Sequence, residues 1–141
     1  MHDVVVYVTN NSKTIFGAVS NAEYHGTMDE GKWQGQGANV AAGAQNVDVG
    51  SAKNDVWASA QTDWTLYSQD LQAGKNHNQF TGSIVGACGS RNHASLTPTA
   101  NNGKDQGTYA VSCKWQDNEP SSRLYVTITD SKTPSGTNCD A

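Results

Sequence analysis

The segment TYAVSCKWQDNEPSSRLYVTITD, residues 108–130, contains the clearest strand patterns of this chain. Apolar or aromatic side chains recur at every second position in residues 109–115 and again in residues 124–128, which is the period of a half-buried β-strand. The polar stretch between the two runs contains Pro120, which cannot donate a hydrogen bond to a β ladder. The segment therefore predicts an antiparallel hairpin with one apolar face. Because a lone hairpin is only marginally stable in water, that face requires a second sheet against it.

Further strand patterns along the chain predict the rest of such a sandwich. Runs rich in β-branched, aromatic or alternating apolar residues lie between clusters of turn residues, at positions 3–9, 14–19, 40, 45–49, 56–67, 80–86 and 94–97. We expect an all-β fold: one sandwich domain of two mainly antiparallel sheets with seven to eight strands over residues 1–141, and a flexible tail from about residue 131. The predicted core packs Val111, Cys113, Leu124, Val126 and Ile128 against residues 4–8, Ile15 and Ile84.

Composition and charge narrow the possible functions. Charged residues make up 16% of the chain, and the formal net charge is −4 at an isoelectric point near 5.4. The nine Lys and Arg residues are scattered, so they predict neither nucleic-acid binding nor electrostatic docking on anionic lipid. No stretch is apolar enough to span a bilayer, and the chain does not start like a signal peptide. We expect a soluble chain, secreted or cytosolic, that associates with membranes.

The cysteines and one sequon leave several interpretations open. Cys88, Cys113 and Cys139 must leave at least one thiol unpaired, and their spacing argues against a metal site. Strand alternation favours Cys113 as a small buried hydrophobe, and a bridge between Cys88 and Cys139 remains possible. Asn10-Asn11-Ser12 is a formal N-glycosylation sequon, although such a short pattern of common residues carries little weight.

A search for catalytic constellations gives two weak clusters. Glu23 and His25 are two residues apart on one predicted strand face, as an acid and a base would be. Arg91 and His93 follow a glycine turn and would suit an anion, although a solvated loop is the simpler interpretation. No GxSxG, HExxH, P-loop or EF-hand spacing occurs. We expect neither enzyme activity nor a cofactor.

Aromatic side chains are the remaining candidates for function, because Trp and Tyr stack on sugars and populate membrane interfaces. Trp64 and Trp115 alternate with aliphatic residues and are expected in the core. By contrast, Trp33 lies in a glycine-rich stretch that we expect to be a surface loop, and Trp57 falls on the opposite strand face. The predicted ligand-binding residues are Tyr24, His25, Trp33, Trp57 and Tyr67.

Several short motifs, taken in order, resemble those of the aegerolysins and their bacterial relatives. They are Val-x-Val-x-x-x-Asn-Asn-Ser at residues 4–12, His25-Gly26, the turn at residues 40–43, the Tyr-ended strand at residues 64–67 and Val-Thr-Ile-Thr at residues 126–129. The Asn-Ser-Lys-Thr turn is also similar to that of the actinoporins. The family's Cys-Gly-Arg-Ser-Asp and Trp-Asp-Cys-Pro-Trp segments have no clean counterpart here. Residues 88–91, Cys-Gly-Ser-Arg, are only distantly similar to the first of them.

The resemblance implies a compact β-sandwich that recognises particular membrane lipids and sometimes forms pores with a partner. We therefore expect a non-enzymatic protein that binds a lipid head group through aromatic and polar loops, with cytolysis as a homo-oligomer or with a partner protein as a further expectation. The first alternative is a lectin that uses the same aromatic and Asn/Asp-rich loops to bind a glycan. The second alternative is a plain structural or storage role.

Overall fold

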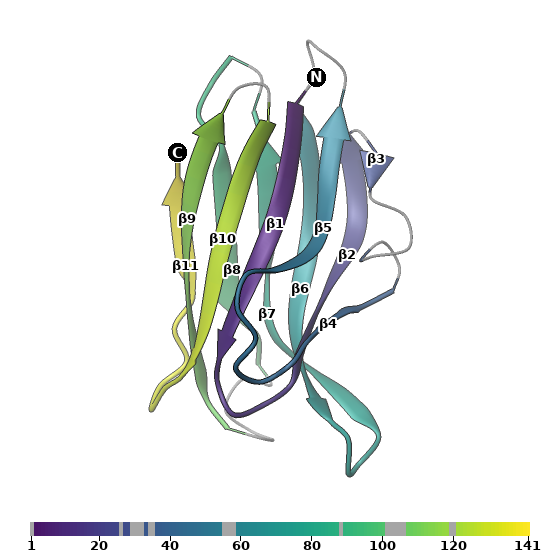
Figure 1. Ribbon diagram of the computed structural model, residues 1–141, viewed down its shortest axis with the longest axis vertical. Coiled ribbons are helices and arrows are strands. Elements are labelled where there is room, and N and C mark those ends of the chain that lie inside the picture. The colour runs from purple at the N-terminus through teal and green to yellow at the C-terminus, as the bar shows by residue number, and fades with distance from the viewer. Residues whose placement is uncertain are drawn as a thin grey trace.

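The computed structural model describes residues 2–25, 27–28, 33, 36–54, 59–87, 89–100, 107–118 and 121–141. These residues form two packed β-sheets with no helix among them, which confirms the predicted all-β sandwich (Figure 1). Eleven strands are assigned in this part of the chain, against the seven to eight predicted. Accordingly, no described helix is long and apolar enough to cross a membrane.

The two sheets, named A and B here, form the two layers of the sandwich. Sheet A has the order β3 (Thr27–Met28), β5 (Val47–Asn54), β1 (His2–Asn11), β10 (Ser121–Asp130) and β9 (Tyr109–Asn118). Sheet B has the order β11 (Thr137–Asp140), β8 (His93–Pro98), β7 (Lys75–Gly86), β6 (Ala60–Asp70), β2 (Phe16–His25) and β4 (Ala38–Val40). All strand pairs are antiparallel except β1 with β10.

The hairpin predicted from residues 108–130 is present as β9 and β10. The two strands pair in one continuous antiparallel register, with Cys113 opposite Val126. Both strands run further into the connecting segment than the sequence pattern indicated, because Ser121 already pairs with Asn118. One face of the hairpin turns inward, and Val111, Leu124, Val126 and Ile128 are buried as predicted.

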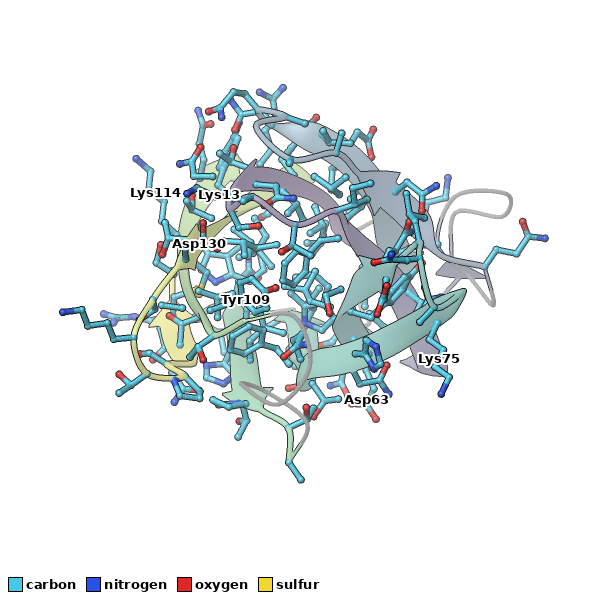
Figure 2. All side chains as sticks on the ribbon, turned by 90° about the horizontal axis from the view of Figure 1, so that it is seen from below. Lys13, Asp63, Lys75, Tyr109, Lys114 and Asp130 are labelled. Atoms are coloured by element: carbon cyan, nitrogen blue, oxygen red, sulfur yellow. A yellow bond between two sulfur atoms is a disulfide. The ribbon has the colours of Figure 1, made fainter. Side chains whose placement is uncertain are left out.

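The core lies between the two sheets and is filled from both sides (Figure 2). Sheet A contributes the alternate residues Val4, Val6 and Val8 of β1, which β5 and β10 flank on either side. Sheet B contributes the inner face of β6, where Ala60, Thr62, Trp64 and Leu66 alternate as the sequence predicts. Of the other residues expected in the core, Ile84 is buried, whereas Ile15 is only partly buried.

The C-terminal segment differs from the flexible tail predicted from about residue 131. Ser135 exchanges backbone hydrogen bonds with the edge strand β9, accepting from Val111 at 2.9 Å and donating to Tyr109 at 3.2 Å. The chain then crosses to sheet B, where β11 pairs with β8. The segment therefore closes one side of the sandwich, at the edge where β9 and β11 lie side by side (Figure 1).

Candidate functional site

Trp33 is a core residue, which corrects the prediction that it lies on a surface loop and binds ligand. Its side chain is 0% exposed, and its ring meets Trp64 edge-on at 5.9 Å between centroids. The indole Nε1 donates a hydrogen bond to the carbonyl of Ser51 at 3.2 Å. A Cβ atom at Gly50 would come within 2.2 Å of the Trp33 ring, so the ring packs directly against glycine backbone. The glycines near Trp33 in sequence suggested a surface loop. The ring is instead buried, because Gly50 leaves the space that it occupies.

Tyr67 is also buried, with 7% exposure, so its ring is not a binding surface. The register of β6 with β7 shifts between Leu66 and Tyr67, and this irregularity breaks simple alternation. The Tyr67 ring lies where glycines leave space: a Cβ at Gly17 would be 2.3 Å from its Cζ, and one at Gly37 would be 1.5 Å from its Oη. Burial raises the pKa of the phenol, and a hydrogen bond with Gln69 opposes that shift.

The other predicted ligand-binding residues are not placed as a site. Tyr24 and His25 lie on the backbone of β2, but their side chains lie outside what the structure describes, as does that of Glu23. Trp57 lies outside the described residues altogether. The predicted cluster of five residues is therefore not shown as one surface.

A different pair of aromatic residues does lie together on a solvent-facing surface. Tyr7 on β1 and Tyr125 on β10 are register partners of two parallel strands, so their side chains are direct neighbours. Their rings are stacked, 5.3 Å apart and 18° from parallel. Both point away from the core, because Val6 and Val8 beside Tyr7, and Leu124 and Val126 beside Tyr125, point inward. Both tyrosines remain partly exposed.

Polar and cationic side chains surround this tyrosine pair on the outer face of sheet A. The Tyr125 hydroxyl donates to Oε1 of Gln116 at 3.3 Å. Arg123 lies two residues before Tyr125 and is exposed, and the neighbouring phenol of Tyr125 raises the pKa of the guanidinium further above its usual value. Lys114 is opposite Tyr125 in register and extends into solvent (Figure 2). We call Tyr7, Lys114, Gln116, Arg123 and Tyr125 the tyrosine face.

The tyrosine face offers two kinds of interaction to one ligand. Arg123 and Lys114 can bind an anionic oxygen, the former with two parallel N–H donors. The phenol rings present aromatic surface to aliphatic or quaternary ammonium groups, and their hydroxyls provide hydrogen bonds. Neither Tyr7 nor Tyr125 is among the ligand-binding residues predicted from the sequence. The sequence of residues 3–9 does not distinguish the two faces of this strand, because Val5 and Tyr7 make the outer face apolar as well.

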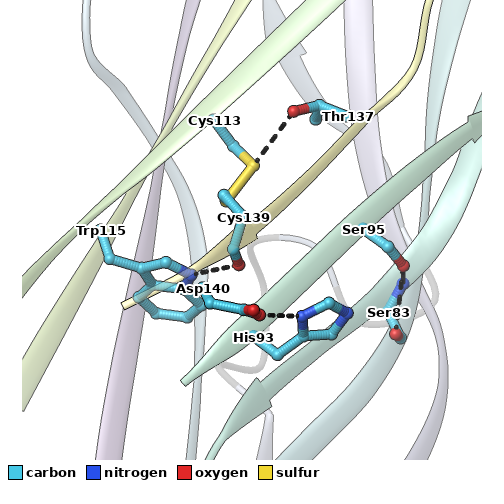
Figure 3. Close-up of polar contacts among 8 residues, drawn as sticks. All are labelled: Ser83, His93, Ser95, Cys113, Trp115, Thr137, Cys139 and Asp140. Atoms are coloured by element: carbon cyan, nitrogen blue, oxygen red, sulfur yellow. Dashed lines mark hydrogen bonds and ion pairs between the residues drawn. A yellow bond between two sulfur atoms is a disulfide. The ribbon is translucent and has the colours of Figure 1, made fainter. Parts of the chain in front are cut away.

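The structure also corrects the interpretation of the cysteines. Cys113 and Cys139 form a disulfide that joins β9 of sheet A to β11 of sheet B, with 6.0 Å between their Cα atoms. Cys113 is therefore not a free buried thiol, and the bridge between Cys88 and Cys139 is excluded. The indole of Trp115 supports the same junction by donating to the carbonyl of Cys139 at 3.0 Å (Figure 3). Cys88 lies outside the described residues.

The sequon does not mark an accessible modification site in the folded chain. Asn10 is 0% exposed, and its Nδ2 donates to the carbonyls of Thr14 and Val40 at 2.8 and 3.1 Å. Its Oδ1 accepts from the backbone N–H and the hydroxyl of Ser12 at 3.0 and 2.7 Å. Asn10 thus organises the turn after β1, and its amide is fully used inside the fold.

The weaker interpretation of Arg91 and His93, an anion site, is affected by a neighbouring carboxylate. Nδ1 of His93 is hydrogen-bonded to Oδ1 of Asp140 on β11, so the imidazole already has an acidic partner (Figure 3). Ser95 follows on the same face of β8, but its hydroxyl bonds Ser83 at 3.3 Å. Among the described contacts, neither serine bonds His93, whereas a catalytic triad requires a hydrogen bond between nucleophile and base. The described residues also contain no cluster of metal-ligating side chains.

Comparison with known proteins adds no family assignment. The chain matches no family model, and no curated protein matches it. The aegerolysin resemblance stays a prediction.

Proposed function

We propose that this protein is a non-enzymatic binding protein that recognises the head group of a membrane phospholipid through the tyrosine face. The observation that carries the proposal is the stacked pair Tyr7 and Tyr125 with the exposed Arg123 beside it on the solvent side of sheet A. The proposal keeps the predicted ligand class and moves the site from loops to a sheet face.

The chemistry of the tyrosine face matches the two parts of such a head group. A phosphate carries the anionic oxygens that a guanidinium and an ammonium bind, and Arg123 and Lys114 supply both. The amine or quaternary ammonium end of a head group is attracted to phenol rings. Tyrosines are also typical of the membrane interface, because one end of the ring is apolar and the other is polar. The chain as a whole is acidic, so local chemistry and not net charge would drive this contact.

The first test measures binding of the chain to phosphatidylcholine vesicles, with and without sphingomyelin or phosphatidylethanolamine, by co-sedimentation. We expect Tyr125→Ala and Arg123→Gln each to weaken binding by about 30-fold, the equivalent of about 2 kcal/mol for an anchoring side chain. Two variants are matched controls: Ser112→Ala on the outer face of sheet A, and Lys132→Gln beyond the end of β10. Both positions are exposed, and neither belongs to the five residues of the tyrosine face. Equal binding by all four variants would refute the site.

Glycan binding and vesicle leakage extend this test. A glycan array probed with the same proteins addresses the lectin alternative: binding to glycans without retention on any vesicle would replace the lipid proposal with the lectin. Binding in neither the vesicle assay nor the glycan array would favour a structural role. Release of a trapped dye from the vesicles tests the expectation, drawn from the family resemblance, that binding leads to pores formed by a homo-oligomer or with a partner protein.

A further inference from the structure

The side chains of residues 113–116 on β9 alternate between the core and the tyrosine face. Lys114 and Gln116 point outward, are exposed and belong to the tyrosine face. Cys113 and Trp115 point inward and are partly buried against the core. Both inward side chains are tied to Cys139, the first by the disulfide and the second by the indole hydrogen bond of 3.0 Å to its carbonyl (Figure 3). The position of Cys139 therefore constrains the part of β9 that carries Lys114 and Gln116.

This part of β9 is paired along one edge. It pairs with β10 on that edge and is the last strand of sheet A. On the other edge, the backbone hydrogen bonds with Ser135 reach Tyr109 and Val111, and none is found further along, at residues 113–116, within the described chain. Residues 113–116 are therefore connected to sheet B by side-chain contacts with β11.

The strand β11 depends on the disulfide more than a central strand would. It is the last strand of sheet B, and each of its four residues keeps some exposure. The hydrogen bond between His93 and Asp140 lies in solvent, because the two side chains are 43% and 63% exposed, and such pairs contribute little. Opening the disulfide leaves β11 held by one short backbone ladder with β8.

The disulfide is placed so that a thiol can react with it. Cys113 and Cys139 are only partly buried, at the edge where the two sheets meet. The hydroxyl of Thr137 donates to Sγ of Cys113 at 3.6 Å, because a disulfide sulfur has no hydrogen to give. This hydrogen bond also stabilises negative charge on Cys113, and a stabilised thiolate is the better leaving group in thiol–disulfide exchange. The geometry therefore favours attack at Cys139 with Cys113 leaving.

We propose that the Cys113–Cys139 disulfide is a redox switch: a dithiol reductant opens it, which releases β11 and loosens the Lys114 side of the tyrosine face. One thiolate of the reductant attacks Sγ of Cys139, and a mixed disulfide forms as the bond to Cys113 breaks. The electron pair goes to Sγ of Cys113, which takes a proton from water. The second thiolate of the reductant then attacks the reductant's own sulfur in the mixed disulfide and frees Cys139. The protein gains two electrons, and the reductant becomes a disulfide. Only the effect on lipid binding rests on the proposed function.

The first test compares the oxidised protein with the protein reduced by dithiothreitol, using amide NMR. It is done in a Cys88→Ser chain, which leaves Cys113 and Cys139 as its two cysteines. Alkylation of both cysteines under native conditions, detected by mass spectrometry, verifies that the disulfide is open. We expect shifted amides and faster amide exchange at residues 113–116 and 137–140, with the amides of β1 and β6 unchanged.

Three results of this test overturn the switch. They are failure of dithiothreitol to open the disulfide under native conditions, unchanged amides at residues 113–116 and 137–140 after it has opened, and loss of the folded signals of β1 and β6. The last result would show that the whole fold requires the disulfide.

A pair of variants tests the direction of attack. Thr137→Val removes the hydroxyl at nearly constant volume and should slow opening by dithiothreitol by about threefold or more, because the leaving sulfur loses a hydrogen bond. Thr133→Val is the matched control at an exposed position of the same segment, and it should open at the wild-type rate. Equal rates in the two variants would overturn the assignment of Cys113 as the leaving sulfur.

Vesicle co-sedimentation tests the coupling to the tyrosine face. The reduced protein should bind the same vesicles about tenfold more weakly than the oxidised protein, because Lys114 is no longer held in place for the phosphate. Equal binding by the two forms, with the disulfide verified open, would overturn this coupling. Failure of the oxidised protein to bind any vesicle would instead refute the proposed function, and the NMR comparison would still decide the switch.

Discussion

Tyrosine residues in this chain have opposite roles that follow from the face each occupies. Tyr109 turns inward, packs edge-on against Phe16 at 4.8 Å, and donates its hydroxyl to Oγ1 of Thr14 at 2.8 Å. Tyr7 and Tyr125 turn outward and stack on each other. The same residue type therefore supplies both core volume and an exposed aromatic surface.

Replacing Trp33 tests the assignment of this residue to the core. Trp33→Ala should lower the free energy of unfolding by about 3–5 kcal/mol, because truncating a buried tryptophan leaves a cavity and removes its contacts with Trp64 and Gly50. Urea denaturation measures the loss. Leu71→Ala is the control, since Leu71 is 72% exposed and its truncation should change stability by less than about 0.5 kcal/mol. A small effect in both variants would contradict the assignment.

Stability should fall in alkaline solution because burial raises the pKa of Tyr109 above its ordinary value of 10.0. Above about pH 10 the unfolded chain releases this proton while the folded chain retains it, so the free energy of unfolding decreases with pH until the folded phenol also ionises. Below pH 10 both states are protonated and this contribution is constant. Tyr67, whose pKa burial also raises, should act in the same direction.

Urea denaturation between about pH 8 and 11 measures this alkaline loss. Tyr109→Phe should show a smaller decrease, after an initial cost of about 1 kcal/mol for the lost hydrogen bond. Thr14→Ala removes the same hydrogen bond but keeps the phenol. Because that bond lowers the pKa of Tyr109, Thr14→Ala should retain the full alkaline decrease. A decrease in Tyr109→Phe as large as that in Thr14→Ala would contradict the explanation.

At the scale of elements, the pairing of β9 with the segment after β10 explains why a short polar C-terminus is ordered. β11 has only four residues, and none of them is fully buried. It is held by backbone pairing with β8, by the Cys113–Cys139 disulfide and by the Trp115 hydrogen bond to Cys139. The disulfide fixes the edge of one sheet to the edge of the other.

Removing the disulfide should cost about 3.5 kcal/mol of unfolding free energy on the chain-entropy estimate for the sequence separation of 26 between Cys113 and Cys139. The double variant Cys113→Ala/Cys139→Ala, compared with the wild type by urea denaturation, measures it. Amide exchange should show faster exchange in β11 than in β1, because β11 loses its covalent tie whereas β1 stays central. Protection of β11 equal to that in the wild type would show that backbone pairing alone holds it.

At the scale of the whole molecule, the topology joins distant parts of the chain. β1 and β10 pair in parallel at the centre of sheet A, so that Asp3 lies beside Ser121. Such pairing forms only after a long loop has closed, which is entropically costly. The arrangement also creates the tyrosine face, because it places the first strand beside a strand near the C-terminus.

This topology predicts slow folding. Refolding followed by tryptophan fluorescence after stopped-flow dilution from urea should occur in the range of milliseconds to seconds, as in other sandwiches dominated by non-local strand pairs. Val6→Ala in β1 and Val126→Ala in β10 should slow it if the central pair forms in the transition state, with Ser112→Ala as a neutral control. Refolding within microseconds would contradict a rate limit set by this topology.

Much of the fold could be predicted because alternation records burial directly. The hairpin of β9 and β10, the inner face of β6 and the two-sheet architecture follow from residues such as Val111, Trp64 and Leu124, each in phase with apolar neighbours. Strand bounds and number were less accurate. The N-terminal half of β7, for example, is polar and joins the sheet through backbone pairing with β6, which leaves no apolar pattern.

The candidate site was less predictable, because exposure of a single aromatic depends on what other segments place beside it. Trp33 is buried against Gly50 and Trp64, and Tyr67 fills the space left by Gly17 and Gly37, contacts that no local pattern records. Cys113 alternates like a core residue, and only the meeting of β9 with β11 selects Cys139 as its partner.

The β class, the apolar faces and the outward direction of Tyr125 follow from the sequence alone, because a strand's period of two is a local property of the backbone. Which strands are neighbours depends on the tertiary structure, and so do the stacking of Tyr7 on Tyr125 and the pairing of Cys113 with Cys139. The physical reason is that strand pairing uses the same backbone hydrogen bonds for every sequence. Packing of the whole core therefore selects the partners.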